Sequence, residues 1–125
     1  MPTQLDLARR TEWALAHWKT CMGCGRTQWS WAFYPLECHE IERRSHATGR
    51  WAALCNLLML CRDCHAGPFA TMQHARQLAH KLFWDSENFD LDAWLRLRDP
   101  ALLAPNRVTY AEISEHLEDL KERFA

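Results

Sequence analysis

Apolar residues recur every three or four positions in three stretches of this chain, which predicts three amphipathic helices. The first spans residues 4–18 and the second spans residues 70–84. The third begins at Thr109, where Thr109 and Glu112 have the spacing of a capping box. Its apolar stripe contains Ile113, Leu117, Leu120 and Phe124, and its opposite face is acidic. A shorter helix is predicted after Asp90, whose carboxylate would cap it.

Between these helices the pattern changes to one typical of strands and loops. Residues 28–34 (QWSWAFY) alternate polar and aromatic positions, residues 36–41 (LECHEI) are expected to end a strand, and a third apolar run leads into Cys61. Residues 42–50 are polar and basic, which predicts an exposed loop, and residues 104–106 are the expected hinge before the last helix. Strands flanked by helices predict a small α+β fold.

Composition narrows the class of protein. The chain has 125 residues, 48% hydrophobic and 25% charged, as expected for one soluble globular domain. No apolar run approaches the roughly 18 residues that a membrane span needs, and the first residues lack the apolar segment of a signal peptide. These features exclude an integral membrane protein and argue against secretion.

Charge and cysteine are unevenly distributed along the chain. The net charge is −1, which gives no overall signal for nucleic acid, but the excess of cations lies before residue 69 and the excess of acids after it. All six cysteines also lie before residue 69. We therefore expect residues 1–69 to carry the chemistry together with the N-terminal helix, and residues 70–125 to be a helical extension packed on that core.

Four cysteines form two CxxC pairs, Cys21 with Cys24 and Cys61 with Cys64. Two residues between thiolates let one turn present both sulfurs to a single ion, and two such turns complete a tetrahedral site that suits zinc. Because the protein supplies all four ligands, the ion would be structural. The missing signal peptide argues against disulfides. The two remaining cysteines, Cys38 and Cys55, are expected to be small buried side chains.

The interval between the two pairs carries polar residues that a purely structural zinc site would not need. His39 lies in the strand end LECHEI, Asn56 precedes the apolar run, and His65 directly follows Cys64. Closing the thiolate site would draw the two ends of this interval together. The side chains of His39, Asn56 and His65 could then converge in one place.

These residues resemble the HNH endonucleases, the zinc-knuckle branch of the ββα-metal nucleases. The matching segments are the first CxxC pair, LECHEIERRS and NLLMLCRDCH, and the spacing from Asn56 to His65 fits the family position by position. The resemblance covers residues 18–66, and the sequence around HEI is similar to that of small phage or prophage HNH proteins. It implies a ββα-metal core built on the four-cysteine zinc site, inside the bacterial or phage-infected cytoplasm.

The resemblance also implies an activity. In this family two antiparallel strands and a helix clasp one divalent ion, Mg²⁺ or a similar metal such as Mn²⁺, and a general base activates water. The expected reaction is hydrolysis of DNA phosphodiester bonds, by nicking or double-strand cutting, with little sequence preference. His65 matches the metal-binding histidine, and Asn56 matches the asparagine that orients the base or helps to hold the metal.

One departure from the family pattern leaves two role assignments open. Aligning Ile41 with the family isoleucine makes His39 a metal ligand beside His65 and puts Glu40 in the place of the base. If the register slips by one residue, His39 is the base and Glu40 or Glu37 supplies a metal oxygen. The second assignment is preferred, because imidazole transfers protons better near pH 7 and carboxylates hold hard cations better. A degenerate site that does no chemistry is the third alternative.

Partners follow from the charges around this interval. The cationic cluster predicted to contact DNA phosphates contains Arg43, Arg44 and Arg50, with Arg26 and Arg62 on the knuckles. Such contacts give affinity without sequence choice. His74 is a conceivable third metal ligand, and the acidic C-terminal helix could dock a protein partner. The rival function is a non-catalytic zinc-stabilised DNA-binding or adaptor module, for example in phage genome packaging.

Overall fold

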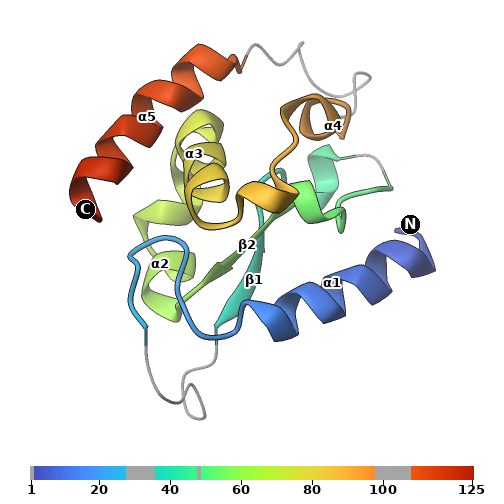
Figure 1. The fold of residues 1–125 in the computed structure, drawn as a ribbon. Coiled ribbons are helices and arrows are strands. Elements are labelled where there is room, and N and C mark those ends of the chain that lie inside the picture. The colour runs from blue at the N-terminus through green and yellow to red at the C-terminus, as the bar shows by residue number, and fades with distance from the viewer. Residues whose placement is uncertain (1, 28–35, 48, 98–107) are drawn as a thin grey trace.

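A computed structural model describes residues 2–27, 36–47, 49–97 and 108–125 of the chain (Figure 1). Its helices are α1 (Gln4–Ala16), α2 (Arg62–Ala66), α3 (His74–Trp84), α4 (Leu91–Leu95) and α5 (Tyr110–Arg123). Its strands are β1 (Glu37–Glu40) and β2 (Leu57–Leu60), and its short 3₁₀ turns are η1 (Arg44–His46), η2 (Leu54–Asn56), η3 (Pro68–Thr71) and η4 (Ser86–Asn88). The predicted α+β fold is confirmed. The strand predicted over 28–34 and the hinge predicted at 104–106 lie outside the described residues.

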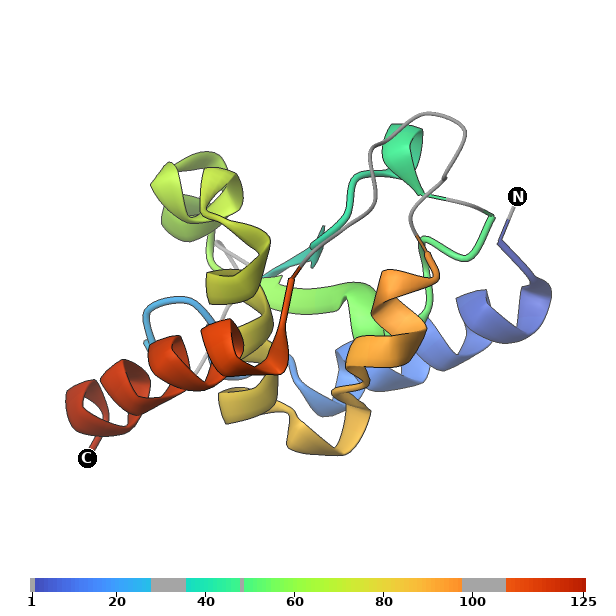
Figure 2. The same ribbon diagram turned by 90° about the horizontal axis from the view of Figure 1, so that it is seen from above.

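The sheet is a two-stranded antiparallel hairpin in which Glu37 lies opposite Leu60 and His39 lies opposite Leu58. Successive side chains of a strand point to opposite faces, so Glu37 and His39 share one face and Glu40 lies on the other. β2 is buried at all four positions. Helices cover both faces, α3 on the face of His39 and α1 on the face of Glu40 (Figures 1 and 2).

The hydrophobic core draws on both predicted segments of the chain. Its fully buried large side chains include Leu57, Leu58 and Leu60 of β2, Leu78 of α3, Trp94 of α4 and Ile113 of α5. The apolar stripe of α5 packs along α3, on the side away from the sheet, and the two ends of the chain lie far apart (Figures 1 and 2). Because α3 packs against both the sheet and α5, even its polar side chains are largely buried.

The helix boundaries follow the predicted caps with two adjustments. Thr109 accepts a hydrogen bond from the backbone N–H of Glu112 at 3.3 Å, and Asp90 accepts one from the N–H of Ala93 at 3.0 Å, which confirms both caps. The first helix ends two residues earlier than expected. The helix predicted from residue 70 begins at His74, because Pro68 opens a separate 3₁₀ turn ahead of it.

A buried ionic network joins the layers beneath the hairpin. The ammonium of Lys81 in α3 donates to the carbonyl of Leu57 at 2.8 Å and to the carboxylate of Asp85 at 2.6 Å. Asp85 also accepts from the indole N–H of Trp13 in α1 at 2.7 Å. Within the part of the chain that the structure describes, no helix is long and apolar enough to cross a membrane.

Candidate functional site

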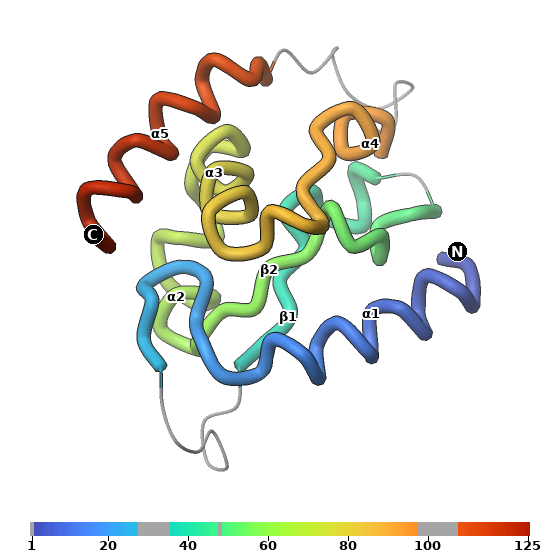
Figure 3. The backbone as a smooth tube through the Cα atoms, viewed as in Figure 1, coloured from blue at the N-terminus to red at the C-terminus, as the bar shows by residue number. Residues whose placement is uncertain are grey.

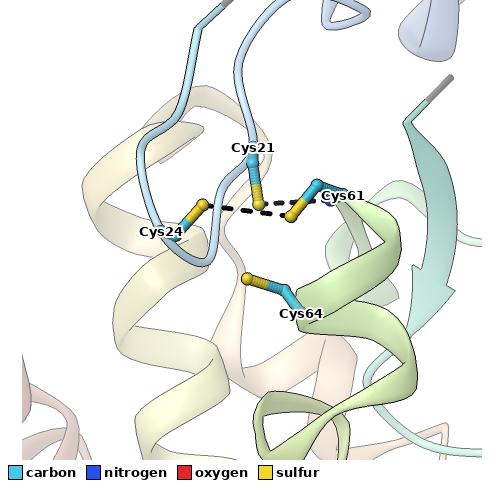
Figure 4. Close-up of side chains that lie close together, drawn as sticks. All are labelled: Cys21, Cys24, Cys61 and Cys64. Atoms are coloured by element: carbon cyan, nitrogen blue, oxygen red, sulfur yellow. Dashed lines mark hydrogen bonds between the residues drawn. The ribbon is translucent and has the colours of Figure 1, made fainter. Parts of the chain in front are cut away.

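The four cysteines of the two CxxC pairs converge, as Figure 4 shows. Their sulfur atoms all lie within 4.8 Å of one another, and the Sγ atoms of Cys24 and Cys61 are 3.9 Å apart. Cys21 and Cys24 come from the turn after α1, whereas Cys61 caps α2 and Cys64 lies inside that helix. The geometry of this thiol cluster could hold a metal ion and is compatible with structural zinc.

Two glycines make the first turn of the thiol cluster possible. Gly25 has a φ of +76°, a left-handed conformation that other residues adopt rarely. A Cβ on Gly23 would lie 3.0 Å from the sulfur of Cys64, so this position needs the smallest residue. The backbone N–H groups of Gly23 and Cys61 donate to the sulfur of Cys21 at 3.4 and 3.2 Å. The segment that follows α1 runs beside α2 (Figure 3), and backbone groups from both segments donate to the sulfur of Cys21.

Crowding of the thiols has an electrostatic consequence. Burial raises the pKa of Cys21 and of Cys64, and the charge of Cys21 raises that of Cys64 further. Four thiolates would repel one another at these distances, whereas a divalent cation between them reverses the balance and favours the deprotonated form. The chemistry of this donor set therefore fits a soft, tetrahedrally bound cation.

The structure also brings His39 and His65 together. Their ring centroids are 5.3 Å apart, with one ring edge facing the other. His39 projects from β1 and is 8% exposed, and His65 follows Cys64 in α2, where its backbone N–H donates to the carbonyl of Cys61 at 2.9 Å. Phe69 closes one side, with its ring 6.5 Å from that of His39. We call His39 and His65 the histidine pair.

Each ring of the histidine pair has one nitrogen engaged by a neighbour. Nδ1 of His65 lies 2.7 Å from a carboxylate oxygen of Glu37, which can only accept, so this nitrogen carries a proton. Nε2 of His39 lies 2.7 Å from the side-chain oxygen of Gln77 in α3. In the neutral form of each ring, Nε2 of His65 and Nδ1 of His39 are then the nitrogens that keep a lone pair. Histidines that bind metals typically have this arrangement, with the second nitrogen donating to an oxygen.

Burial lowers the pKa of His39, and the charges of His65 and His74 lower it further. The hydrogen bond to Gln77 works in the opposite direction without cancelling the effect. His39 is therefore neutral at pH 7, the state in which an imidazole can accept a proton or bind a metal.

The histidine pair is less convergent than the thiol cluster. Among the residues described, the four cysteines are the only group of three or more His, Cys, Asp or Glu side chains whose ligand atoms all approach within 4.8 Å. The carboxylate of Glu37 is engaged by Nδ1 of His65. The histidine pair itself contributes two imidazole nitrogens, Nδ1 of His39 and Nε2 of His65, and no third converging ligand among the described residues.

Glu40 is not brought to the histidine pair. It lies on the opposite face of β1, where its carboxylate accepts from the guanidinium of Arg44 at 2.6 Å and lies 3.8 Å from that of Arg10. The alternation of side chains along a strand separates it from its neighbour His39. Of the two carboxylates considered in the sequence, only Glu37 lies beside the pair.

Asn56 is not brought to the histidine pair either. Its side chain is fully buried, and its oxygen accepts from the backbone N–H of Glu42 at 2.7 Å and from the indole of Trp94 at 2.9 Å. Its amide donates to the carbonyls of Glu42 and Trp51 at 3.1 and 2.9 Å. These bonds use both polar ends of the amide to fix the loop between the strands. None of them reaches the histidine pair.

The arginines predicted to contact DNA differ in their availability. Arg50 makes two hydrogen bonds to the carboxylate of Asp6 in α1, at 2.9 and 3.1 Å. Arg44 is tied to Glu40 and stacks over the ring of Trp51 at 3.7 Å. Arg43 is exposed. The first two arginines therefore have structural partners, and Arg43 is the more accessible cation of this loop.

Two further observations complete the comparison with the sequence. Cys55 is buried, as expected, and burial raises its pKa to about 11, whereas Cys38 is only half-buried. Gln77 was not identified from the sequence. Its burial in α3, where a polar side chain needs a specific partner, cannot be read from the helical pattern.

Comparison of the chain with protein-family models, with curated proteins and with solved structures gave no match to any of them, so the chemistry must be inferred from these side chains.

Proposed function

We propose that this protein is a metal-dependent endonuclease of the HNH type, which hydrolyses DNA phosphodiester bonds at the histidine pair. The observation that carries the proposal is the edge-to-face approach of His39 and His65, 5.3 Å apart, with one nitrogen of each ring engaged and the other left as a lone-pair donor. The family resemblance of residues 18–66 supplies the reaction class.

The thiol cluster would hold zinc in a structural role. All four ligands come from the chain, so no position is open for substrate. Cys61 and Cys64 belong to the first turns of α2, and His65 is the next residue. A zinc ion here would hold the start of α2, and with it the backbone of His65, against the hairpin.

Within the histidine pair, His65 would bind the catalytic cation through Nε2, with Glu37 fixing its ring through Nδ1. When bound, Mg²⁺ or Mn²⁺ would stabilise negative charge on the phosphate and on the leaving 3′ oxygen. His39 would accept a proton from the attacking water at Nδ1 as the bond between phosphorus and the 3′ oxygen breaks. Its neutral state near pH 7 suits that task.

The positions of the carboxylates favour His39 over Glu40 as the base. Both oxygens of Glu40 face arginines across the sheet, at 2.6 and 3.8 Å. These contacts hold the Glu40 carboxylate on the face of the hairpin away from His39 and His65. The other assignment, with both histidines as ligands and Glu40 as the base, predicts instead that removing the Glu40 carboxylate abolishes cleavage.

Nicking of supercoiled plasmid in the presence of Mg²⁺ or Mn²⁺ tests the proposal. We expect His65→Ala and His39→Ala each to lower the cleavage rate by at least about 100-fold, the range that loss of an acid–base group typically costs. His116→Ala, in α5, is the matched control and should cleave at the wild-type rate. Zinc content and melting temperature must be unchanged in the variants compared. Full activity of His65→Ala would contradict the proposal.

The second candidate function is a zinc-stabilised DNA-binding or adaptor module without catalysis. Its support is the absence, among described residues, of a second group of three converging ligands. It predicts equal DNA binding by the wild type and by His65→Ala, with no cleavage under any divalent metal.

A further inference from the structure

We propose that Gln77 is a positioning residue, which holds His39 as the tautomer protonated on Nε2 and so presents Nδ1 to the reaction. The inference rests on the proposed function for its catalytic meaning. Gln77 lies outside residues 18–66, and no feature of the motif requires a glutamine at that place.

The hydrogen bonds of Gln77 define which way its amide faces. Its Nε2 donates to the backbone carbonyl of Met72 at 2.8 Å, and a carbonyl can only accept. The side-chain oxygen must therefore be the atom that faces His39, 2.7 Å from Nε2. Because that oxygen can also only accept, the network assigns the proton to Nε2 of His39. The free lone pair of the neutral ring is then on Nδ1.

Burial makes this arrangement hard to exchange for another. Gln77 is 2% exposed and His39 is 8% exposed, so water has little access to replace either partner. Rotating the amide would place two carbonyl oxygens, that of Gln77 and that of Met72, against each other. Turning the imidazole over would remove the donor that the buried oxygen of Gln77 needs, and a buried acceptor without a donor is unfavourable.

Glu37 imposes the opposite tautomer on the other ring. It accepts from Nδ1 of His65 at 2.7 Å, which leaves Nε2 as the lone-pair donor there. The two rings of the histidine pair are thus held in different tautomers by partners from different elements, Glu37 from β1 and Gln77 from α3. One face of the hairpin and one helix together determine which nitrogens are available.

A merely structural Gln77 would satisfy the same buried atoms, so the test must report the tautomer itself. The zinc-loaded protein is labelled with ¹⁵N in histidine and examined by long-range ¹H–¹⁵N NMR at pH 7.5, without a second metal. We expect His39 in the wild type to show a protonated Nε2 and an unprotonated Nδ1. In Gln77→Met, which keeps the length of the side chain and lacks the acceptor, we expect a mixture of tautomers. Gln77→Glu keeps an acceptor beside Nε2 of His39 and should keep that nitrogen protonated, although its second oxygen would oppose the carbonyl of Met72.

Plasmid nicking by the same proteins gives the second readout. Gln77→Met should cleave about 10- to 100-fold more slowly than the wild type, the usual effect of losing such an outer partner. A single Nε2-protonated tautomer in Gln77→Met, or its cleavage at the wild-type rate, would overturn the proposal. If Gln77→Met does not fold, a wild-type spectrum with Nδ1 of His39 protonated overturns it.

The two proposals fail differently. A wild type that cleaves DNA while Gln77→Met cleaves equally well contradicts the role of Gln77 and leaves the nuclease proposal standing. A wild type that never cleaves DNA, yet shows the single tautomer lost in Gln77→Met, contradicts the nuclease proposal and supports the positioning of His39 by Gln77.

Discussion

The thiol cluster and the histidine pair both use helix α2, where Cys64 belongs to the first and the next residue, His65, to the second, and they are built differently. In the thiol cluster four ligand atoms approach within 4.8 Å and leave no place for a further ligand. In the histidine pair two rings stand 5.3 Å apart, each held from outside by one polar partner. The first arrangement suits an ion that stays and stabilises. The second suits an ion that shares its coordination with water and substrate.

The largest expected effect comes from removing one ligand of the thiol cluster. Cys61→Ser should remove the bound zinc and unfold the chain, because the binding free energy of structural zinc, about 10–16 kcal/mol in small zinc domains, contributes directly to folding. Zinc content and thermal melting followed by circular dichroism measure it. Cys38→Ser is the matched control, since Cys38 lies outside the cluster, and it should retain one zinc. A folded, zinc-containing Cys61→Ser protein would contradict the assignment.

The next effect concerns His80 of α3, which contacts the turn that carries Cys21 and Cys24. Its Nδ1 donates to the carbonyl of Met22 at 2.8 Å, and burial lowers its pKa to about 4, helped by the charges of Arg123, Arg76 and His116. The unfolded chain takes up a proton near pH 6.5, while the folded chain does so only near pH 4. Stability should therefore fall as the pH is lowered through this window.

Lowering the pH from 7 to 5 should reduce the free energy of unfolding by about 2 kcal/mol through His80. Denaturant unfolding of the wild type and of His80→Gln, both saturated with zinc, measures the difference. Protonation of the zinc thiolates affects both proteins alike, so the comparison isolates the imidazole. Equal pH dependence in the two proteins would show that His80 does not contribute.

The two carboxylates of β1, Glu37 and Glu40, are expected to differ in their importance for the histidine pair. Glu37→Gln should lower DNA cleavage by about 10- to 100-fold, because the carboxylate that orients His65 is lost. Glu40→Gln should change it by less than about threefold, as expected for a change of about 0.5 kcal/mol away from the reaction. The ratio of the two nicking rates is the measurement. Loss of activity in Glu40→Gln alone would instead make Glu40 the base.

The smallest effects separate structural from DNA-facing arginines. Arg50→Ala should lower the unfolding free energy by about 1 kcal/mol, because it leaves the buried carboxylate of Asp6 without its partner. Arg43→Ala should leave stability unchanged, weaken DNA binding several-fold and reduce the salt dependence of the affinity by about one ion. Chemical unfolding and a salt series of binding curves measure these effects. Reversed results would exchange the two roles.

The thiol cluster could be predicted from the sequence because each CxxC pair is formed by residues close together in the chain. Two residues between cysteines suffice to place both sulfurs in one turn, and Gly25 provides the left-handed backbone that this turn needs. Thr109 and Asp90 were identified as caps for the same reason, since a cap bonds to residues within three positions of itself. The start of α3 was placed too early, because Pro68 begins a turn that the apolar pattern does not reveal.

The histidine pair and its surroundings could be predicted only in part. His39 and His65 were expected to meet, and they do. Glu40 was expected beside them from the family register, and Asn56 from the family match and the closing of the interval between the CxxC pairs. Strand alternation instead turns Glu40 to the other face, and loop packing engages Asn56. Gln77 could not be predicted, because its bond to His39 depends on how α3 packs over the hairpin.

The central claim is that one chain holds two metals in two different ways. Crystals of the protein grown with zinc and Mn²⁺, with anomalous diffraction collected at the absorption edges of both metals, test it most directly. The account predicts a zinc peak among the four sulfurs and a manganese peak within about 2.5 Å of Nε2 of His65. A zinc peak alone, with no manganese near either ring, would contradict it.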